Sequence, residues 1–275
     1  MIIFQEPFWG YELTYGDGWT RRTVGDAEWF LPHSEPVEEP QDENLQGHLI
    51  IRAEWVYPAP QIEPLWNRHI GSMAGMIGAK NVSSVRWLLG GASGYEAEIV
   101  LPKKSNKRLW TGILQKDSVF LNFVVAHYLK DRDWFEPAVS KVISSLRIPQ
   151  HIEAIQTNSK DVPIPPGYRH GDPTRVISDI NDPGNWEAYR GDISIGALQA
   201  FYIREAVAFG WDIMGFVPFP SQEDDIGFAQ LRMKKSGISC TLGLMPYGGD
   251  GIDIKSPANV VMKYNDHLSE GFFDH

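Results

Sequence analysis

The chain has 275 residues and only one cysteine, Cys240. A single cysteine excludes an intramolecular disulfide, which agrees with a protein that stays in a reducing compartment. Cys240 alternates with Ile238 and Leu242 in a strand-like run, so we expect a buried, unreactive thiol rather than a nucleophile. On these grounds we expect a cytoplasmic protein.

Basic residues are also scarce. The sequence holds 25 lysine and arginine residues against 35 aspartate and glutamate residues, a formal net charge of -10. Binding to a phosphate backbone needs clustered positive charge, so nucleic acid is not an expected partner. No stretch approaches the ~20 apolar residues of a membrane-spanning helix, and the first residues lack the basic and apolar regions of a signal peptide. We therefore expect neither membrane insertion nor secretion.

Common catalytic motifs are missing as well. The sequence contains no G-x-S-x-G, no Walker loop, no G-x-G-x-x-G after a strand, no H-E-x-x-H and no C-x-x-C. These are the patterns that place nucleophiles, phosphates, dinucleotides and metals. We therefore predict no catalytic residue, no cofactor and no metal ligand, and we favour a non-enzymatic role.

Two weaker signals of chemistry have simpler explanations. His127 ends an apolar strand, where a histidine that finds a carbonyl partner is favoured over a general base. A dense set of carboxylates would suit a hard cation, but its spacing does not match an EF-hand, so solvated turn residues are the favoured interpretation. This set consists of Asp172, Asp179, Asp182, Glu187 and Asp192.

Aromatic residues, in contrast, are plentiful: ten Trp, ten Tyr and thirteen Phe. Such rings fill cores or anchor protein interfaces. We therefore expect some of them to form a surface that binds another protein, and the candidates are Trp55, Trp66, Trp186, Trp211, Phe272 and Phe273.

The first half of the chain alternates apolar and polar residues, as strands do. Val119, Leu121, Phe123 and Val125 share one face of a strand whose other face is also apolar, so we expect it in the middle of a sheet. Further strands are predicted at 48–57, 95–101 and 108–114, and helical spacing predicts helices at 62–77 and from Asp131 or Asp133 to Pro149.

Composition then marks a boundary. Residues 150–162 are polar and lead into closely spaced prolines, so they are predicted to be a linker between a domain at 1–149 and a smaller one at 163–265. The second half carries a predicted helix at 194–209 and strands at 227–233, 237–245 and 259–264. A polar tail at 266–275 is expected to fray. The predicted fold class is α+β, with two domains that each pack helices on an antiparallel sheet.

Four stretches of the first half resemble the PsbP-like family, the fold that includes Mog-type and bacterial DcrB-type proteins. They are 10–19, with its glycine-tryptophan turn, 94–97, 119–126 and 142–148. The resemblance covers residues 1–149 and implies an antiparallel sheet flanked by helices in an α/β/α sandwich. Residues 162–264 are more weakly similar to unassigned bacterial α+β domains, through Phe201-Tyr202 and Gly210-Trp211.

Members of the PsbP-like family share no catalytic residues and mostly act as accessory partners, so the resemblance implies a non-catalytic accessory or assembly protein. The absence of catalytic motifs and the many aromatic residues also favour this non-catalytic role. The alternative is a small-molecule-binding protein or a hydrolase with a site in the cleft between the domains. The partner would be another protein, and homo-oligomerisation is a further option.

Overall fold

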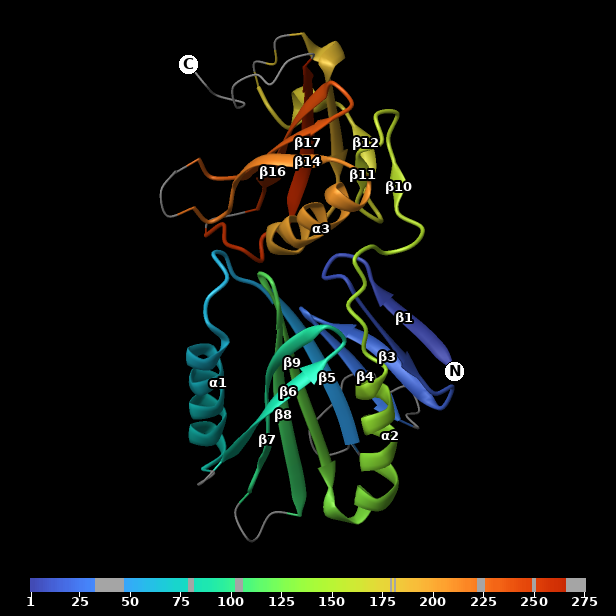
Figure 1. Cartoon of the computed structure of the whole chain (residues 1–275), viewed down its shortest axis with the longest axis vertical. Helices are drawn as coiled ribbons and strands as arrows, with labels where there is room; N and C mark the ends of the chain where they lie inside the picture. The colour runs from blue at the N-terminus through green and yellow to red at the C-terminus, as the bar shows by residue number, and fades with distance from the viewer. Residues whose placement is uncertain are drawn as a thin grey trace. The chain divides into compact units, whose positions relative to one another are not determined.

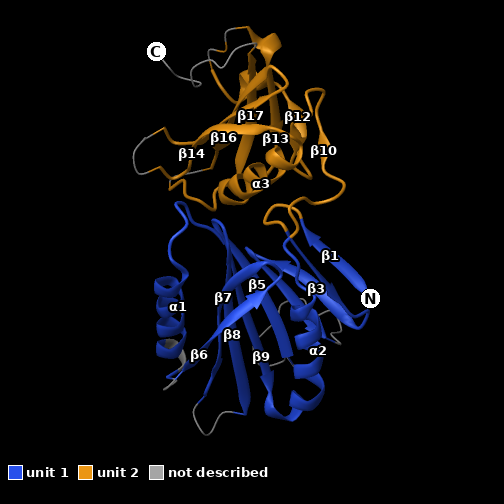
Figure 2. Cartoon of the chain, viewed as in Figure 1, with its two compact units in different colours: residues 1–6, 11–148 blue, residues 7–10, 149–275 orange. Residues whose placement is uncertain are grey.

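A computed structural model describes residues 1–32, 47–78, 82–101, 106–178, 180, 182–221, 226–248 and 251–265. The chain forms two compact units (Figure 2). Unit 1 consists of Met1–Glu6 and Tyr11–Ile148, and unit 2 of Pro7–Gly10 and Pro149–His275. Nothing in the sequence pattern indicated that residues 7–10 would group with the C-terminal half.

Unit 1 contains an antiparallel sheet of seven strands in the order β3-β4-β5-β9-β8-β7-β6 (Figure 1). A separate pair of strands, β1 (Ile2–Glu6) and β2 (Tyr11–Tyr15), forms a small sheet of its own. The strands of the large sheet are β3 (Trp19–Val24), β4 (Ala27–Pro32), β5 (Gly47–Trp55), β6 (Ser83–Leu89), β7 (Ala92–Ile99), β8 (Lys107–Lys116) and β9 (Val119–Tyr128).

Two helices cover opposite faces of this sheet. Helix α1 (Ile62–Ile77) buries Trp66 in a cluster with Ala97, Ile113 and Phe120. Helix α2 (Arg132–Ser144) follows a 3-10 turn, η1 (Leu129–Asp131), and its Phe135 ring lies 5.2 Å from the ring of His127 on β9. Because side chains alternate along a strand, Phe120 and His127 point to opposite faces of β9. The central strand is therefore covered on both sides, as its two apolar faces predict.

Unit 2 is built on a sheet of six antiparallel strands in the order β12-β13-β17-β16-β15-β14. Helix α3 (Ile195–Ala208) begins at Ser194, whose Oγ accepts a hydrogen bond from the Ala197 N–H at 3.3 Å, a typical N-cap. The strands are β12 (Arg169–Gly171), β13 (Trp186–Arg190), β14 (Asp212–Val217), β15 (Ala229–Lys235), β16 (Ile238–Pro246) and β17 (Ala258–Asn265).

The core of unit 2 lies between α3 and this sheet. Leu198, Phe201 and Tyr202 of α3 pack with Leu231, Leu242 and other buried strand residues. Short elements complete the unit: β10 (Gln156–Thr157) pairs with β11 (Pro163–Ile164), and η2 (Pro173–Arg175) and η3 (Pro183–Asn185) are single 3-10 turns. The stretch predicted to be a linker thus contains β10 and buries Ile152 and Val162.

In the described part of the chain, no sheet combines strands from both sides of Ile148. The predicted fold class, α+β with antiparallel sheets packed by helices, is confirmed. None of the helices in the described ranges has the length and apolar character that a membrane span requires.

Candidate functional site

The structure places the aromatic residues expected at an interface mostly inside the units. Trp66 is 2% exposed and Trp211 is 1% exposed, each within a hydrophobic core, and Trp55 is also buried. Side chains packed in this way cannot form a binding surface on the folded chain, because burying them is what stabilises the unit. Trp186 is half-buried, with the Lys263 ammonium 5.5 Å from its ring. Phe272 and Phe273 lie outside the described residues.

A different set of aromatic and charged side chains comes together in a pocket of unit 1. This pocket, of about 340 Å³, lies between α2 and strands β6 to β9. Its polar and aromatic lining consists of Trp87, Glu96, Glu98, Arg108, Trp110, His127, Glu136, Ser140 and Ser144. We refer to it as the acidic pocket.

Two indoles form an apolar wall of the acidic pocket. The rings of Trp87 on β6 and Trp110 on β8 meet edge to face, with centroids 5.4 Å apart, and Trp87 also contacts Phe123 at 5.1 Å. Gly112 makes this arrangement possible, since a Cβ atom there would lie 2.7 Å from the Trp87 ring. The indole of Trp87 is thus packed against Trp110, Phe123 and Gly112.

The strand register places charged side chains beside the indoles of Trp87 and Trp110. Glu96 and Glu98 are two residues apart on β7 and share one sheet face; Glu98 lies opposite Trp110 on β8. Glu96 Oε2 accepts a hydrogen bond from Trp110 Nε1 at 3.0 Å, and Glu98 Oε1 accepts one from Arg108 Nη1. Both carboxylates are therefore oriented by neighbours and remain partly accessible to a ligand.

The end of β9 and helix α2 close the pocket on its other side. His127 is buried, and its Nδ1 lies 2.9 Å from the Tyr128 carbonyl oxygen, which can only accept a hydrogen bond. Its Nε2 lies 3.3 Å from Glu136 Oε1, and Glu136 also pairs with Arg132 one helical turn earlier. This is the carbonyl-bonded rim histidine that the sequence favoured.

The lining therefore combines three carboxylates, one guanidinium and two indole faces. Carboxylates and indoles both attract cations, the first by charge and the second through the negative face of the ring. In the described residues no group of three or more His, Cys, Asp or Glu side chains is arranged to hold a metal ion. The arrangement suits an organic cation with an apolar stem.

A second hollow, of about 460 Å³, lies on the opposite face of the sheet beside α1. His69 of α1 lines it and stacks on Trp66, and His69 Nε2 lies 2.9 Å from Thr111 Oγ1. The Thr111 hydroxyl donates its own proton to the Phe123 carbonyl at 2.7 Å, so His69 Nε2 carries the hydrogen of this contact. Burial lowers the pKa of His69.

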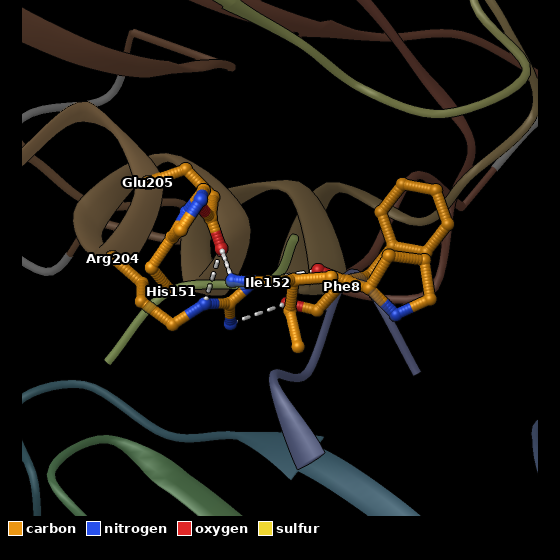
Figure 3. A network of polar contacts seen from close by, with 6 residues as sticks. Phe8, His151, Ile152, Arg204 and Glu205 are labelled. Atoms are coloured by element: carbon orange, nitrogen blue, oxygen red, sulfur yellow. Dashed lines mark hydrogen bonds and ion pairs between the residues drawn. The ribbon is translucent and has the colours of Figure 1, made fainter. Parts of the chain in front are cut away.

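Unit 2 contains a network of hydrogen bonds and ion pairs that connects separate segments of the unit (Figure 3). The Glu205 carboxylate is fully buried and accepts hydrogen bonds from His151 Nδ1 at 2.6 Å, the Ile152 N–H at 3.2 Å and Arg204 Nε at 2.8 Å. Arg204 also donates to the carbonyl oxygens of Pro7 at 2.5 Å and Phe8 at 3.1 Å. The network, which we call the Glu205 clasp, ties residues 7–8 and 151–152 to α3.

Of the carboxylates expected in solvated turns of unit 2, Asp172, Asp182 and Asp192 are exposed and lie outside its helices and strands. Asp172 Oδ1 accepts hydrogen bonds from the Thr174 N–H and hydroxyl, and these bonds lower the pKa of Asp172. The expectation is wrong for Glu187, which lies half-buried in strand β13 and accepts hydrogen bonds from Asn158 and from the Tyr189 hydroxyl. Asp179 lies outside the described residues.

Comparison with known proteins concerns the fold. No family model matches the sequence, and no curated protein matches it. The structure of cyanobacterial PsbP from Synechocystis sp. PCC 6803 is similar at 13% identity with a TM-score of 0.41, covering 54% of this chain and 92% of that one. The Ran-binding protein Mog1p of Saccharomyces cerevisiae is similar at 6% identity with a TM-score of 0.38, covering 54% and 94%.

A crystal structure from Bacteroides thetaiotaomicron VPI-5482 is similar over more of the chain, 92% of this one and 89% of that one, at 8% identity and a TM-score of 0.38. The similarities to PsbP and Mog1p, proteins of the fold that the sequence resembles, extend over roughly half of the chain. Similarity at this level concerns the fold alone.

The sequence contained a signal for the acidic pocket that residue motifs did not reveal. Glu96 and Glu98 occupy one face of a predicted strand, and the neighbouring predicted strand carries Arg108 and Trp110 with the same spacing. Two hairpin-linked strands with charged residues on one shared face indicate that this face is not simply core. The contribution of α2 required the tertiary structure.

Proposed function

We propose that this protein is a non-catalytic binding protein that recognises another protein through a basic side chain inserted into the acidic pocket of unit 1. The observation that supports the proposal is the convergence of Glu96, Glu98 and Glu136 on the paired indoles of Trp87 and Trp110. A lysine or arginine side chain has the matching form, because an apolar stem can lie along the rings while its charged end meets the carboxylates.

The charge of the whole molecule supports the same class of ligand. A net charge of -10 favours the approach of a basic partner and raises its association rate. An anionic ligand would meet three carboxylates against one guanidinium, and a neutral ligand would gain no attraction from this excess of negative charge. A cation is the ligand that the pocket favours.

The experiment compares two pools of random peptides that differ at one fixed central residue, lysine in one and norleucine in the other. Norleucine keeps the apolar stem and removes the charge. Because hydrogen bonds to a charged group contribute about 1.5 kcal/mol or more, the lysine pool is expected to bind roughly tenfold more tightly to the full chain. Fluorescence polarisation with labelled pools measures the difference.

Matched variants show whether the preference comes from the acidic pocket. The double variant Glu96→Gln with Glu98→Gln is expected to lose the preference for lysine. Glu54→Gln is the control, because Glu54 lies opposite Phe120 in register and therefore faces the other side of the sheet. Equal affinity of both pools for the unmodified chain contradicts the proposal. If free butylamine binds as tightly as the lysine pool, the ligand is a small amine and not a protein.

A further inference from the structure

The two large sheets end in four outer strands: β3 and β6 in unit 1, and β12 and β14 in unit 2. An outer strand exposes unpaired N–H and C=O groups, and proteins usually protect it with charge, short length or a bulge. Three of these strands carry such protection. β14 has a register shift between Ile213 and Gly215, β12 is three residues long, and β3 carries two successive arginines, Arg21 and Arg22.

Strand β6 differs from the other three. All seven of its residues, Ser83 to Leu89, pair with β7 in continuous register without a bulge. Its one charged residue, Arg86, lies opposite Tyr95 and therefore on the sheet face away from the acidic pocket. Two of its apolar side chains are unusually exposed, Val85 at 58% and Leu88 at 76%. Among the described residues, no strand pairs with the outer side of β6. A long, regular outer strand with exposed Val85 and Leu88 and a single charge is a ready site for another strand.

We infer that β6 binds an extended segment of the partner protein as an eighth strand of the unit 1 sheet, and that this segment carries the basic side chain into the acidic pocket. The inference rests on the proposed function and specifies the form of the partner. Backbone hydrogen bonds to β6 would supply affinity, and the pocket would select a basic residue at one position.

The register of the sheet supports this placement. Val85 and Trp87 point to the pocket face, because Val85 lies opposite Glu96 and Trp87 opposite Gly94 on β7. An added strand would lie about 4.8 Å beyond β6. A residue beside Val85 or Trp87 would then be one strand away from the indole and two strands away from Glu96, within reach of a long basic side chain across the ring of Trp87.

Charge argues against a second copy of this chain as the occupant of β6. Pairing of two β6 strands would bring two acidic pockets close together, each with three carboxylates, between molecules of net charge -10. Like charges placed together disfavour association. A basic segment from another protein has complementary charge.

The test uses a defined probe, a capped heptapeptide of alternating threonine and valine with lysine at its centre, and its norleucine counterpart. Single N-methyl groups are introduced at successive residues, since each removes one backbone donor without changing a side chain. In a strand bound along one edge, alternate N–H groups face the neighbour. We expect methylation to weaken binding at least tenfold at every second residue and to have little effect between them.

Hydrogen exchange of the full chain gives an independent measurement. The lysine peptide is expected to slow amide exchange in Ser83–Leu89, while the outer strand β3 serves as the internal control and remains unchanged. A flat methylation scan or unchanged exchange in β6, with the lysine preference of the random pools intact, overturns the strand inference and leaves the proposed function standing. Loss of the lysine preference itself contradicts the proposed function instead.

Sedimentation of the unbound chain tests the remaining alternative. The chain is expected to be monomeric at the concentrations of the binding assays. A dimer that dissociates when Leu88→Lys adds charge to the edge strand would show that a second copy occupies β6, and would overturn the inference.

Discussion

Removing the carboxylate at the centre of the Glu205 clasp should strongly destabilise unit 2. In Glu205→Ala the buried Ile152 N–H loses its acceptor, which costs about 1–3 kcal/mol, and Arg204 loses the charge that balances it. Breaking a buried ion pair by deleting one partner costs about 3–5 kcal/mol in comparable cases. Glu205→Gln keeps one acceptor oxygen and the same size, so a smaller loss of about 1–3 kcal/mol is expected.

The single cysteine provides an assay that reports on unit 2 alone. Cys240 is buried in the core of this unit and reacts with a thiol reagent only when the unit opens. When opening and closing are fast, the labelling rate follows the free energy of unfolding. A loss of 3 kcal/mol therefore corresponds to labelling that is faster by roughly two orders of magnitude.

Glu153→Ala is the matched control, because Glu153 is an exposed carboxylate in the same segment as His151. Its labelling rate should stay close to that of the unmodified chain. If Glu205→Ala is labelled no faster than Glu153→Ala, the clasp does not stabilise unit 2 and the reasoning from buried charge fails.

Three further predictions concern single groups. Native Cys240 should not react with thiol reagents between pH 7 and 8 while the unfolded chain reacts at once, since burial raises its pKa; rapid native labelling would contradict its placement. The pKa of His69 is lowered in the folded chain, so below its unfolded value of 6.5 the unfolded state binds the extra proton and stability should fall. His69→Gln, which keeps a donor for Thr111, should flatten this pH dependence in urea unfolding, and an unchanged slope would refute the cause given. Gly112→Ala should displace Trp87 and abolish the lysine preference of the acidic pocket, measured by the peptide pools, while thiol labelling of unit 2 stays unchanged.

Much of the framework could be predicted from the sequence where local pattern and tertiary environment agree. The helix predicted at 194–209 is observed at Ile195–Ala208, and the strand around Phe123 is the central strand of its sheet, as its two apolar faces indicated. Periodicity identifies such elements because one residue type faces one environment along their whole length.

The remaining features depended on contacts that periodicity does not report. Strand β6 was missed because an outer strand with exposed Val85 and Leu88 has no buried face to impose alternation. Aromatic content predicted rings at an interface, yet it could not distinguish the core residues Trp66 and Trp211 from Trp87 and Trp110 in the acidic pocket. Only the strand register shows which indoles lie beside carboxylates.

The grouping of Pro7–Gly10 with unit 2 has a consequence for how the chain is made. Phe8 is separated from Arg204, which binds its carbonyl oxygen, by 196 positions. At a synthesis rate of about 5–20 residues per second, the ribosome delivers the arginine roughly ten to forty seconds after the phenylalanine. Glycine at position 10 leaves room for the Arg204 side chain, because a Cβ atom there would lie 2.2 Å from the guanidinium. Unit 2 therefore takes part of its core and of the Glu205 clasp from outside residues 149–275, and a fragment that begins at Pro149 would lack Phe8 and these contacts.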